Sequence, residues 1–186
     1  MHIQTTPLPG VLLLTPTEHR DHRGGLIEQY HHNRYYQAGI TQQFVQFNFS
    51  HSKKNVLRGL HLQMHRPQGK LVFVTHGQIL DVVVDIHPHS ATFKQYFCVV
   101  LSAQNRKQLW IPPGYAHGFL TLSHEAHCHY LCTEHYDPHS QAGVYWQDPE
   151  LAIPWPCQDP ILSEQDQRQP TLQEFLHQYY PQDCSS

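Results

Sequence analysis

The chain has 186 residues, of which 39% are hydrophobic and 15% charged. This composition excludes an intrinsically disordered protein and predicts one domain, residues 1–186, with a substantial core. The net charge of −3 excludes a strongly basic binder of nucleic acid or membrane surfaces. Histidine is abundant, at 18 copies against 12 for lysine and arginine together, so histidine abundance alone identifies no site.

The cysteine content predicts a reducing compartment. The number of cysteines is odd and no CxxC pair occurs, so we expect free thiols and a cytoplasmic protein. The N-terminal residues contain no basic segment followed by a long apolar run, so we expect no signal peptide. The apolar run at residues 11–14 is far too short to span a bilayer. The cysteines are Cys98, Cys128, Cys132, Cys157 and Cys184.

Short extended segments follow one another along the chain, separated by turn signals such as Pro9-Gly10, residues 21–25 and His76-Gly77. Many short strands at intervals of about ten residues are typical of an all-β sandwich or barrel. A brief helix ending at Gly39 is expected over residues 32–39, and an amphipathic helix over residues 171–179. Strands are expected at residues 7–14, 26–30, 44–50, 56–63, 70–75, 79–86, 93–101, 109–111 and 126–133.

The segments at residues 57–63 and 68–70 bring together the side chains with the most obvious chemistry. Arg58, His61 and Lys70 lie within thirteen residues of apolar, β-prone sequence. A histidine between two fixed cations can stay neutral near pH 7, because a further positive charge is disfavoured there. A neutral imidazole in an anion-attracting pocket is suited to abstracting a proton from a negatively charged substrate. The competing interpretation is a barrel-lining histidine with a satisfied hydrogen bond.

Strand alternation sets a condition on this site. Arg58 and His61 are three residues apart, so a regular strand would place them on opposite faces. Both can enter one cavity only if the strand is bulged near Gly59, which a glycine permits. Alternation also places Cys128, Tyr130 and Cys132 on one face, suited to a barrel interior from which the tyrosine could act as an acid. An ordinary packed tyrosine is the alternative.

Gln46 and Asn48 share a face of the strand expected at residues 44–50. They could bind a polar ligand, or they could be two amides that face solvent. The segment alone does not decide between these interpretations.

A metal site is the alternative to proton transfer at His61. Small β-barrels often bind a metal through a His-x-His pair, a downstream carboxylate and a later histidine. Here the pair position reads His61-Leu62-Gln63, and an amide is a weak ligand. His117 could be the later ligand, but no carboxylate follows His61 before Asp81. The chain also lacks a Walker loop, a GxGxxG motif and a GxSxG motif. We therefore expect no metal, no bound nucleotide cofactor and no serine-nucleophile chemistry.

The motifs of the whole chain, in order, resemble the dTDP-4-dehydrorhamnose 3,5-epimerase family. Each fragment by itself is weak evidence for this resemblance, but the RGLHxQ, QGK and PxGxAHGF segments together are specific to the family. The matching segments are residues 21–24, 46–50, 58–63, 68–71, 110–112, 114–119, 146–149 and 161–164.

The resemblance implies a cupin-type jelly-roll β-barrel with a few short helices, mainly C-terminal, that forms a homodimer. It implies no cofactor, no metal, and dTDP-4-dehydro-6-deoxy-glucose as the substrate, epimerised at C3 and C5 next to the C4 ketone. The family's base then matches His61, and the aspartate that orients the base matches Asp166. The family's acid matches Tyr130, and its lysine near the C4 oxygen matches Lys70. Substrate- or nucleotide-binding positions match Arg23, Glu28, Gln46, Asn48, Arg58, His117 and Gln141.

Four positions depart from the family pattern. Gln141 stands where a glutamate is usual, and Gln165 where a lysine commonly precedes the aspartate. Leu131 stands where lysine is common, and Leu26 where an aromatic residue is common. These departures concern nucleotide affinity and sugar preference, so two alternatives stay open: an epimerase that acts at C3 or C5 alone, and a non-catalytic barrel that binds nucleotide sugars.

Overall fold

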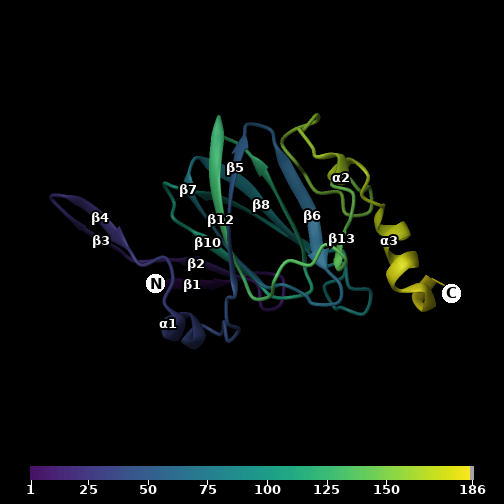
Figure 1. Cartoon of the computed structure of the whole chain (residues 1–186), viewed down its shortest axis with the longest axis horizontal. Coiled ribbons are helices and arrows are strands. Elements are labelled where there is room, and N and C mark those ends of the chain that lie inside the picture. Colours follow the sequence, from purple (N-terminus) through teal and green to yellow (C-terminus); the bar gives the residue numbers. More distant parts are fainter. Residues whose placement is uncertain (185–186) are drawn as a thin grey trace.

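The computed structural model describes residues 1–184 and shows two antiparallel β-sheets packed face to face (Figure 1). This confirms the predicted all-β jelly roll. The larger sheet contains, in spatial order, β1 (His2–Thr5), β2 (Leu12–Thr15), β10 (Gln108–Ile111), β7 (Lys70–His76), β12 (Glu125–Cys132) and β5 (Gln46–Lys53). The smaller sheet contains β13 (Gln141–Gly143), β6 (Leu57–Gln63), β11 (Ala116–Thr121), β8 (Gln78–Val84) and β9 (Tyr96–Ser102).

Most predicted strands are confirmed, with boundaries that move by a few residues. The expected strand over residues 7–14 is wrong in its first half, because residues 7–10 form a turn and β2 begins only at Leu12. The turn expected over residues 21–25 is too long, because Asp21 and Gly24 already belong to the paired strands β3 (Glu18–Asp21) and β4 (Gly24–Ile27). The sequence prediction missed β1, β3, β11 and β13.

The main core lies between the two sheets. Alternate residues of β7 and β12, such as Val72, Val74 and Cys128, point inward and meet Val83 and Phe119 of the smaller sheet. Each inward side chain is almost completely buried. Burial of this kind contributes roughly 1.5–3 kcal/mol for each large apolar side chain, so the facing sheets stabilise each other.

Helices cover parts of the outer faces. Helix α1 (His32–Gln37) packs Tyr35 against Trp110 and Leu71 of the larger sheet, and ends before Gly39, which has a φ of 95°. Helix α3 (Leu172–Tyr179) packs Phe175 against the outside of the smaller sheet. The brief helix and the C-terminal helix expected from the sequence are therefore confirmed.

Two short helical turns complete the C-terminal part. These are α2 (Glu164–Gln167) and the 3-10 turn η1 (Pro181–Cys184). Four of the expected free thiols, those of Cys98, Cys128, Cys132 and Cys157, are unpaired in the structure. The side chain of Cys184, expected to be a fifth, lies outside the described residues. Within residues 1–184, no helix has the length and apolarity needed to cross a membrane.

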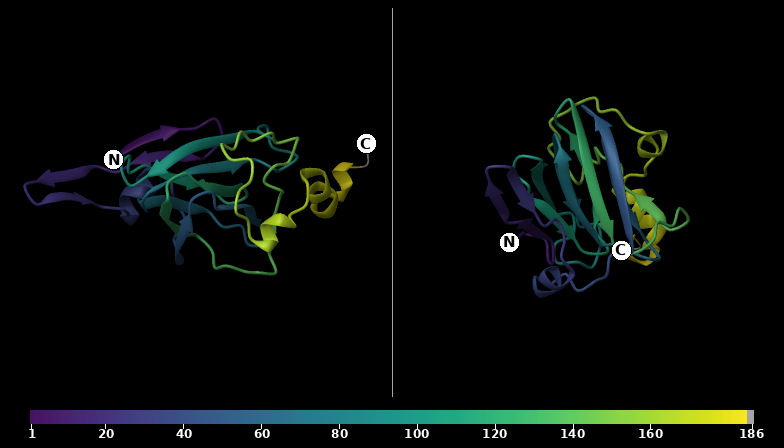
Figure 2. Two further views of the ribbon diagram at one scale, coloured as in Figure 1. Left: turned by 90° about the horizontal axis from the view of Figure 1, so that it is seen from above. Right: turned by 60° about the vertical axis from the view of Figure 1, so that its left-hand side comes forward.

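The β3–β4 hairpin extends away from the body of the molecule (Figures 1 and 2). It pairs with itself as a separate two-stranded sheet. Isolated two-stranded ribbons are marginally stable in water, so the hairpin is a candidate for contact with another molecule.

Strand β6 contains the bulge that the sequence required. His61 pairs with His117 and Arg58 pairs with Phe119, so β6 has one residue more than β11 across the same interval. Gly59 has a φ of 124°, and a Cβ there would lie 2.5 Å from the Cα of Gly118. Glycine is therefore required at the bulge for both conformation and space. The extra residue lets Arg58 and His61 face the same cavity.

Candidate active site

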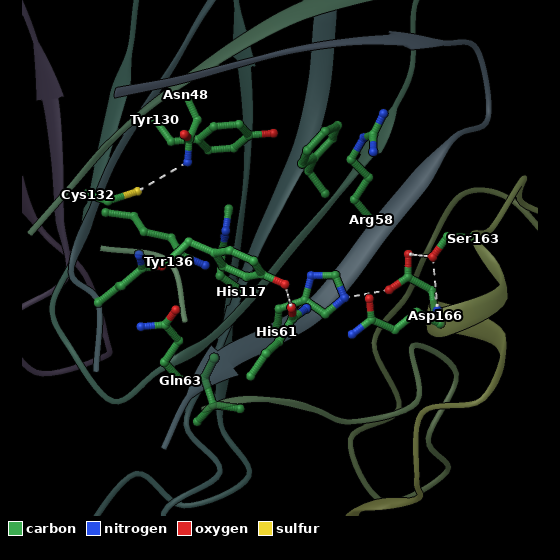
Figure 3. Close-up of a pocket in the computed structure, with 16 residues that line it drawn as sticks. Asn48, Arg58, His61, Gln63, His117, Tyr130, Cys132, Tyr136, Ser163 and Asp166 are labelled. Carbon is green, nitrogen blue, oxygen red and sulfur yellow. Dashed lines mark hydrogen bonds and ion pairs between the residues drawn. The ribbon is translucent and has the colours of Figure 1, made fainter. Parts of the chain in front are cut away.

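A cavity of about 400 Å³ lies between residues of the two sheets (Figure 3). This volume lies within the range typical of small-molecule sites. Both sheets and α2 contribute side chains, so groups from opposite walls face the same space. The cavity is lined by Asn48, Arg58, His61, Leu62, Gln63, Gln68, Lys70, His117, Phe119, Tyr130, Cys132, Tyr136, Gln141, Ser163, Gln165 and Asp166.

His61 is held by a carboxylate from α2. Its Nε2 lies 2.5 Å from Oδ1 of Asp166, which is 3% exposed. Ser163 begins the helix, and its hydroxyl accepts from the backbone N–H of Asp166 and donates to Oδ2 of the carboxylate at 2.8 Å. Serine is a favoured residue at this position because its side chain satisfies a free helix N–H. The same serine therefore caps the start of the helix and fixes the carboxylate that holds the imidazole.

The protonation of Asp166 determines which nitrogen of His61 is basic. Burial pushes the pKa of Asp166 upward, but the hydrogen bonds and charge of His61 and the hydroxyl of Ser163 outweigh it and hold the pKa below its ordinary value. An ionised carboxylate only accepts hydrogen bonds, so Nε2 of His61 carries the proton that it shares with Asp166. Nδ1 is then the basic nitrogen available to a substrate in the cavity.

Tyr130 comes from the opposite sheet. It lies on β12 of the larger sheet, whereas His61 lies on β6 of the smaller one, and both line the cavity (Figure 3). The Tyr130 hydroxyl is hydrogen-bonded to Oγ of Ser50 at 2.7 Å. Burial raises the pKa of Tyr130 well above its ordinary value, with a further upward contribution from Cys128. The phenol therefore stays protonated near neutral pH and can donate a proton.

Two cationic side chains reach the cavity from different strands. Arg58 of β6 donates from Nε to Oγ of Ser52 at 3.0 Å. Lys70 of β7 also lines the cavity, and burial lowers its pKa while Cys132 and Asp81 act in the opposite direction. These cations can stabilise negative charge that develops on a bound ligand.

His117 is fixed by a buried carboxylate. Its Nε2 lies 3.0 Å from each oxygen of Asp81, and both residues are almost fully buried. This pair comes from the neighbouring strands β11 and β8 of the smaller sheet. The imidazole of His117 is thus oriented at the cavity wall next to His61, its cross-strand partner.

A chain of amides lines the rim of the cavity. Gln46 donates from Nε2 to Oδ1 of Asn48 at 2.9 Å and accepts from the backbone N–H of Tyr136 at 2.8 Å. Tyr136 in turn donates to Oε1 of Gln141 at 2.5 Å. Asn48 and Gln141 line the cavity. Gln46 does not line it, but its side chain contacts Asn48 and the backbone of Tyr136. The shared face predicted for Gln46 and Asn48 is therefore turned to the site.

The expectation that His61 and Gln63 do not form a metal-binding pair is supported by the contacts of the amide. Gln63 accepts from the backbone N–H of Asp137 at 2.8 Å and donates to the carbonyl of Arg66 at 2.8 Å. Its oxygen is therefore used by the protein backbone. Nε2 of His61 and Nε2 of His117 each face a carboxylate rather than a shared point.

Besides Gln46, two further predicted binding residues do not line this cavity. Arg23 on the β3–β4 hairpin forms an ion pair with Asp21 at 2.6 Å, and Glu28 forms one with Arg34 at 2.9 Å. The cavity also contains groups that the sequence analysis did not select, Gln63, Gln68, Cys132, Tyr136, Ser163 and Gln165. Ser163 could have been identified from the sequence, because a serine three residues before Asp166 matches the start of a helix. Tyr136 comes from a loop, and no local pattern directs it to the site.

The chain matches the family model described as dTDP-4-dehydrorhamnose 3,5-epimerase over residues 5–174. It is 45% identical over 179 residues to the dTDP-4-dehydrorhamnose 3,5-epimerase of Escherichia coli, which covers 95% of this chain and 97% of the relative. The enzyme of Methanothermobacter thermautotrophicus is 42% identical over 172 residues, covering 91% of this chain and 93% of the relative.

Solved structures give the same result. The epimerase of Legionella pneumophila in complex with dTDP-4-keto-L-rhamnose superposes with a TM-score of 0.90 at 44% identity, covering 92% of this chain and 93% of that one. ChmJ, a 3'-monoepimerase of Streptomyces bikiniensis in complex with dTDP-quinovose, gives a TM-score of 0.85 at 31% identity, covering 96% of both chains. On the motifs, the fold and these relatives, the chain belongs to the dTDP-4-dehydrorhamnose 3,5-epimerase family.

Proposed function

We propose that this enzyme epimerises dTDP-4-dehydro-6-deoxy-D-glucose at C3 and C5 to dTDP-4-dehydro-L-rhamnose, a step of dTDP-L-rhamnose biosynthesis. The observation that carries the proposal is the placement of His61, oriented by Asp166, and Tyr130 on opposite walls of one cavity. A base and an acid on opposite sides of a sugar ring are what inversion of a carbon requires. All the proposed proton transfers use side chains of this chain.

The first step removes a proton next to the ketone. Nδ1 of His61 takes the proton from C3 or C5, and the electron pair of the broken C–H bond moves into a C=C bond to C4 while the C4 oxygen becomes an enolate. The nearby ammonium of Lys70 stabilises that oxygen, as charge-stabilising groups do when they are placed in advance. Asp166 stabilises the imidazolium that forms.

The second step returns a proton on the other face. The hydroxyl of Tyr130 donates its proton to the same carbon, the enolate collapses to the ketone, and the configuration of that carbon is inverted. C3 and C5 both flank C4, so one base and one acid can serve both carbons in turn. Arg58 is available for the diphosphate, because guanidinium groups bind phosphate oxygens in pairs.

Solvent-proton exchange tests the proposal directly. Incubating the enzyme with dTDP-4-dehydro-6-deoxy-glucose in D₂O should place deuterium at both C3 and C5, because each inverted carbon receives its new proton from a group that exchanges with solvent. Proton NMR would follow the loss of both signals. Binding of the substrate without exchange at either carbon would refute the epimerase and favour a non-catalytic nucleotide-sugar-binding barrel.

One relative gives a specific reason to consider the alternative of a single-centre epimerase. ChmJ acts at the 3' position alone and shares the fold at 31% identity, below the 45% shared with the Escherichia coli enzyme. The same NMR experiment separates the two activities, since deuterium at one carbon only would assign the chain to the single-centre class.

We also propose that the enzyme is a cytoplasmic homodimer. Phe47 and Phe49 of the edge strand β5, 63% and 57% exposed, and Val45 just before it, 46% exposed, leave a large apolar surface. At the other edge of the same sheet, every residue of β1 is exposed. Large exposed apolar patches and unpaired edge strands support association with a second copy. The free thiols support the cytoplasmic location.

The dimer would also explain where Arg23 and Glu28 act. The hairpin that carries Arg23 extends away from the body of the molecule (Figure 2), and Arg23 does not line the cavity of its own chain. If the hairpin reaches the cavity of the second copy, the two residues can contact the nucleotide there. The family resemblance assigns nucleotide contacts to Arg23 and Glu28. Contacts made in the cavity of the second copy would agree with this assignment without any movement of the hairpin relative to its own chain.

Mixing two defective variants tests this arrangement. Arg23→Ala chains retain His61, and His61→Ala chains retain Arg23, so mixed dimers should contain one complete cavity and regain activity that neither variant shows alone at low substrate concentration. Sedimentation of the wild-type enzyme, expected at twice the chain mass, is the accompanying control. A monomeric mass, or no gain on mixing after subunit exchange, would contradict the proposal.

A further inference from the structure

A row of three histidines crosses the outer face of the larger sheet, on the side opposite the active-site cavity. In register, His127 of β12 pairs with His51 of β5 and with His76 of β7. The ring centroids of His51 and His127 are 5.2 Å apart, and those of His76 and His127 are 5.0 Å apart. Three neighbouring strands therefore present an imidazole at the same level of the sheet.

A carboxylate completes this cluster. Glu125 lies two residues before His127, so strand alternation places it on the same outer face. One of its oxygens lies 3.0 Å from Nε2 of His51, and the other lies 3.4 Å from Nε2 of His76.

The geometry of the ligand atoms suits a metal ion. Ligand atoms of His51, Glu125 and His127 all lie within 4.8 Å of one another. Ligands at the usual bond lengths of tetrahedral zinc lie roughly 3.3 Å apart, a distance that small side-chain rotations reach from here. Imidazole and carboxylate are also the ligand types that divalent transition metals of intermediate softness prefer.

The surroundings leave the cluster accessible while fixing its strands. In the single chain, the side chains of His51, Glu125 and His76 are between 37% and 57% exposed, so an ion can reach them. The alternate residues of the same strands, Ser52 and Ala126, are buried on the inner face. The backbone that carries the ligands is thus anchored in the core, and the antiparallel ladder between β5 and β12 is continuous through the cluster.

We propose that His51, Glu125 and His127 form a binding site for a divalent transition-metal ion such as Zn²⁺. His76, which faces the other oxygen of Glu125, would be a further ligand. The site is separate from the epimerase cavity, because its side chains project from the other face of the larger sheet. A bound ion would join β5, β12 and β7 at the end of the sheet next to the exposed Phe49, whose ring lies 5.4 Å from that of His127.

Metal titration of the full chain, prepared without a polyhistidine tag and stripped with a chelator, tests the site. Calorimetry with ZnCl₂ should show one saturable ion per chain, and Co²⁺ should give the visible absorption of a tetrahedral site. His127→Gln and Glu125→Gln should each weaken Zn²⁺ binding by roughly tenfold or more, since even the loss of outer-shell partners of metal ligands costs 10–100-fold.

The matched control is His87→Gln, which removes a histidine from another neighbouring pair, His87 and His89, with ring centroids 5.7 Å apart. It should leave Zn²⁺ binding unchanged. All three variants should keep epimerase activity, because none lines the cavity, and this activity reports that they fold. Wild-type binding no tighter than that of His127→Gln, or equal loss in His87→Gln, would refute the site and leave the cluster as a set of surface ion pairs.

Discussion

Replacing His61 with alanine is expected to lower epimerase turnover by roughly 10²–10⁴-fold, the range typical of the loss of one acid or base. His61 supplies the only proposed acceptor for the proton of C3 or C5, so deuterium exchange and inversion should fall together. Binding of dTDP should persist, because the guanidinium and amide groups of the cavity are unchanged. Steady-state kinetics and deuterium incorporation at both carbons measure the two effects.

Two further variants separate chemistry from folding in this experiment. His65→Ala removes an exposed histidine, four positions after His61, that does not line the cavity, and it should leave turnover unchanged. Asp166→Asn keeps the shape of the carboxylate but removes its charge, so it should lower turnover through loss of the tautomer that makes Nδ1 basic. A His61→Ala enzyme within about tenfold of wild type would exclude His61 as the general base.

Replacing Tyr130 with phenylalanine should separate proton abstraction from inversion. The variant keeps the aromatic ring against Phe119 but loses the hydroxyl that is hydrogen-bonded to Ser50. Formation of the inverted product should fall by roughly 10²–10⁴-fold, whereas His61 can still remove and return a proton on its own face. Deuterium should therefore enter the substrate with retained configuration.

Product stereochemistry by NMR is the measurement that decides this prediction. Tyr115→Phe is the matched control, because the Tyr115 hydroxyl donates to the carbonyl of Pro9 outside the cavity, and its loss should not change inversion. Inversion by Tyr130→Phe at the wild-type rate would show that another group, or water, delivers the second proton. Loss of exchange together with inversion would show that the hydroxyl is already needed for proton abstraction.

The faces of the longest strands could be predicted from the sequence, because burial on one side imposes a period of two. Tyr130 and Cys132 line the cavity from one face of β12, as alternation predicted. For Asn48, alternation predicted only a face shared with Gln46; in the structure Asn48 lines the cavity and Phe47 turns outward. The need for a bulge at Gly59 also followed from the spacing of Arg58 and His61. These features depend on neighbours in the chain, so a single sequence is enough to reveal them.

Other elements gave no local signal. β1 is fully exposed and lacks the alternation that marks a half-buried strand. β11 contains His117 and Gly118, which have low strand propensity, and is a strand because β6 and β8 pair with it on either side. Tertiary pairing, rather than intrinsic preference, determines both of these strands.

The contact between His61 and Asp166 could not be derived from spacing. The two residues are 105 positions apart, and α2 is a single short turn of helix. Only the resemblance to known epimerases connected them before the structure was available. Arg23 and Glu28 show the reverse case. The resemblance assigned both to the ligand, whereas the single chain places Arg23 on the β3–β4 hairpin and Glu28 just after β4, in an ion pair with Arg34.

The extra residue of β6 opposite Gly118 makes the site depend on the number of residues as well as on their type. Leu60 and Leu62 pack on the outside of the smaller sheet, while Arg58 and His61 face inward on either side of the bulge. Deleting one residue between Arg58 and His61 would straighten the strand and turn one of the two away from the ligand. Surface loops tolerate insertions and deletions during divergence. The interval from Arg58 to His61 does not, because a change in its four residues would turn one of the two side chains to the other face.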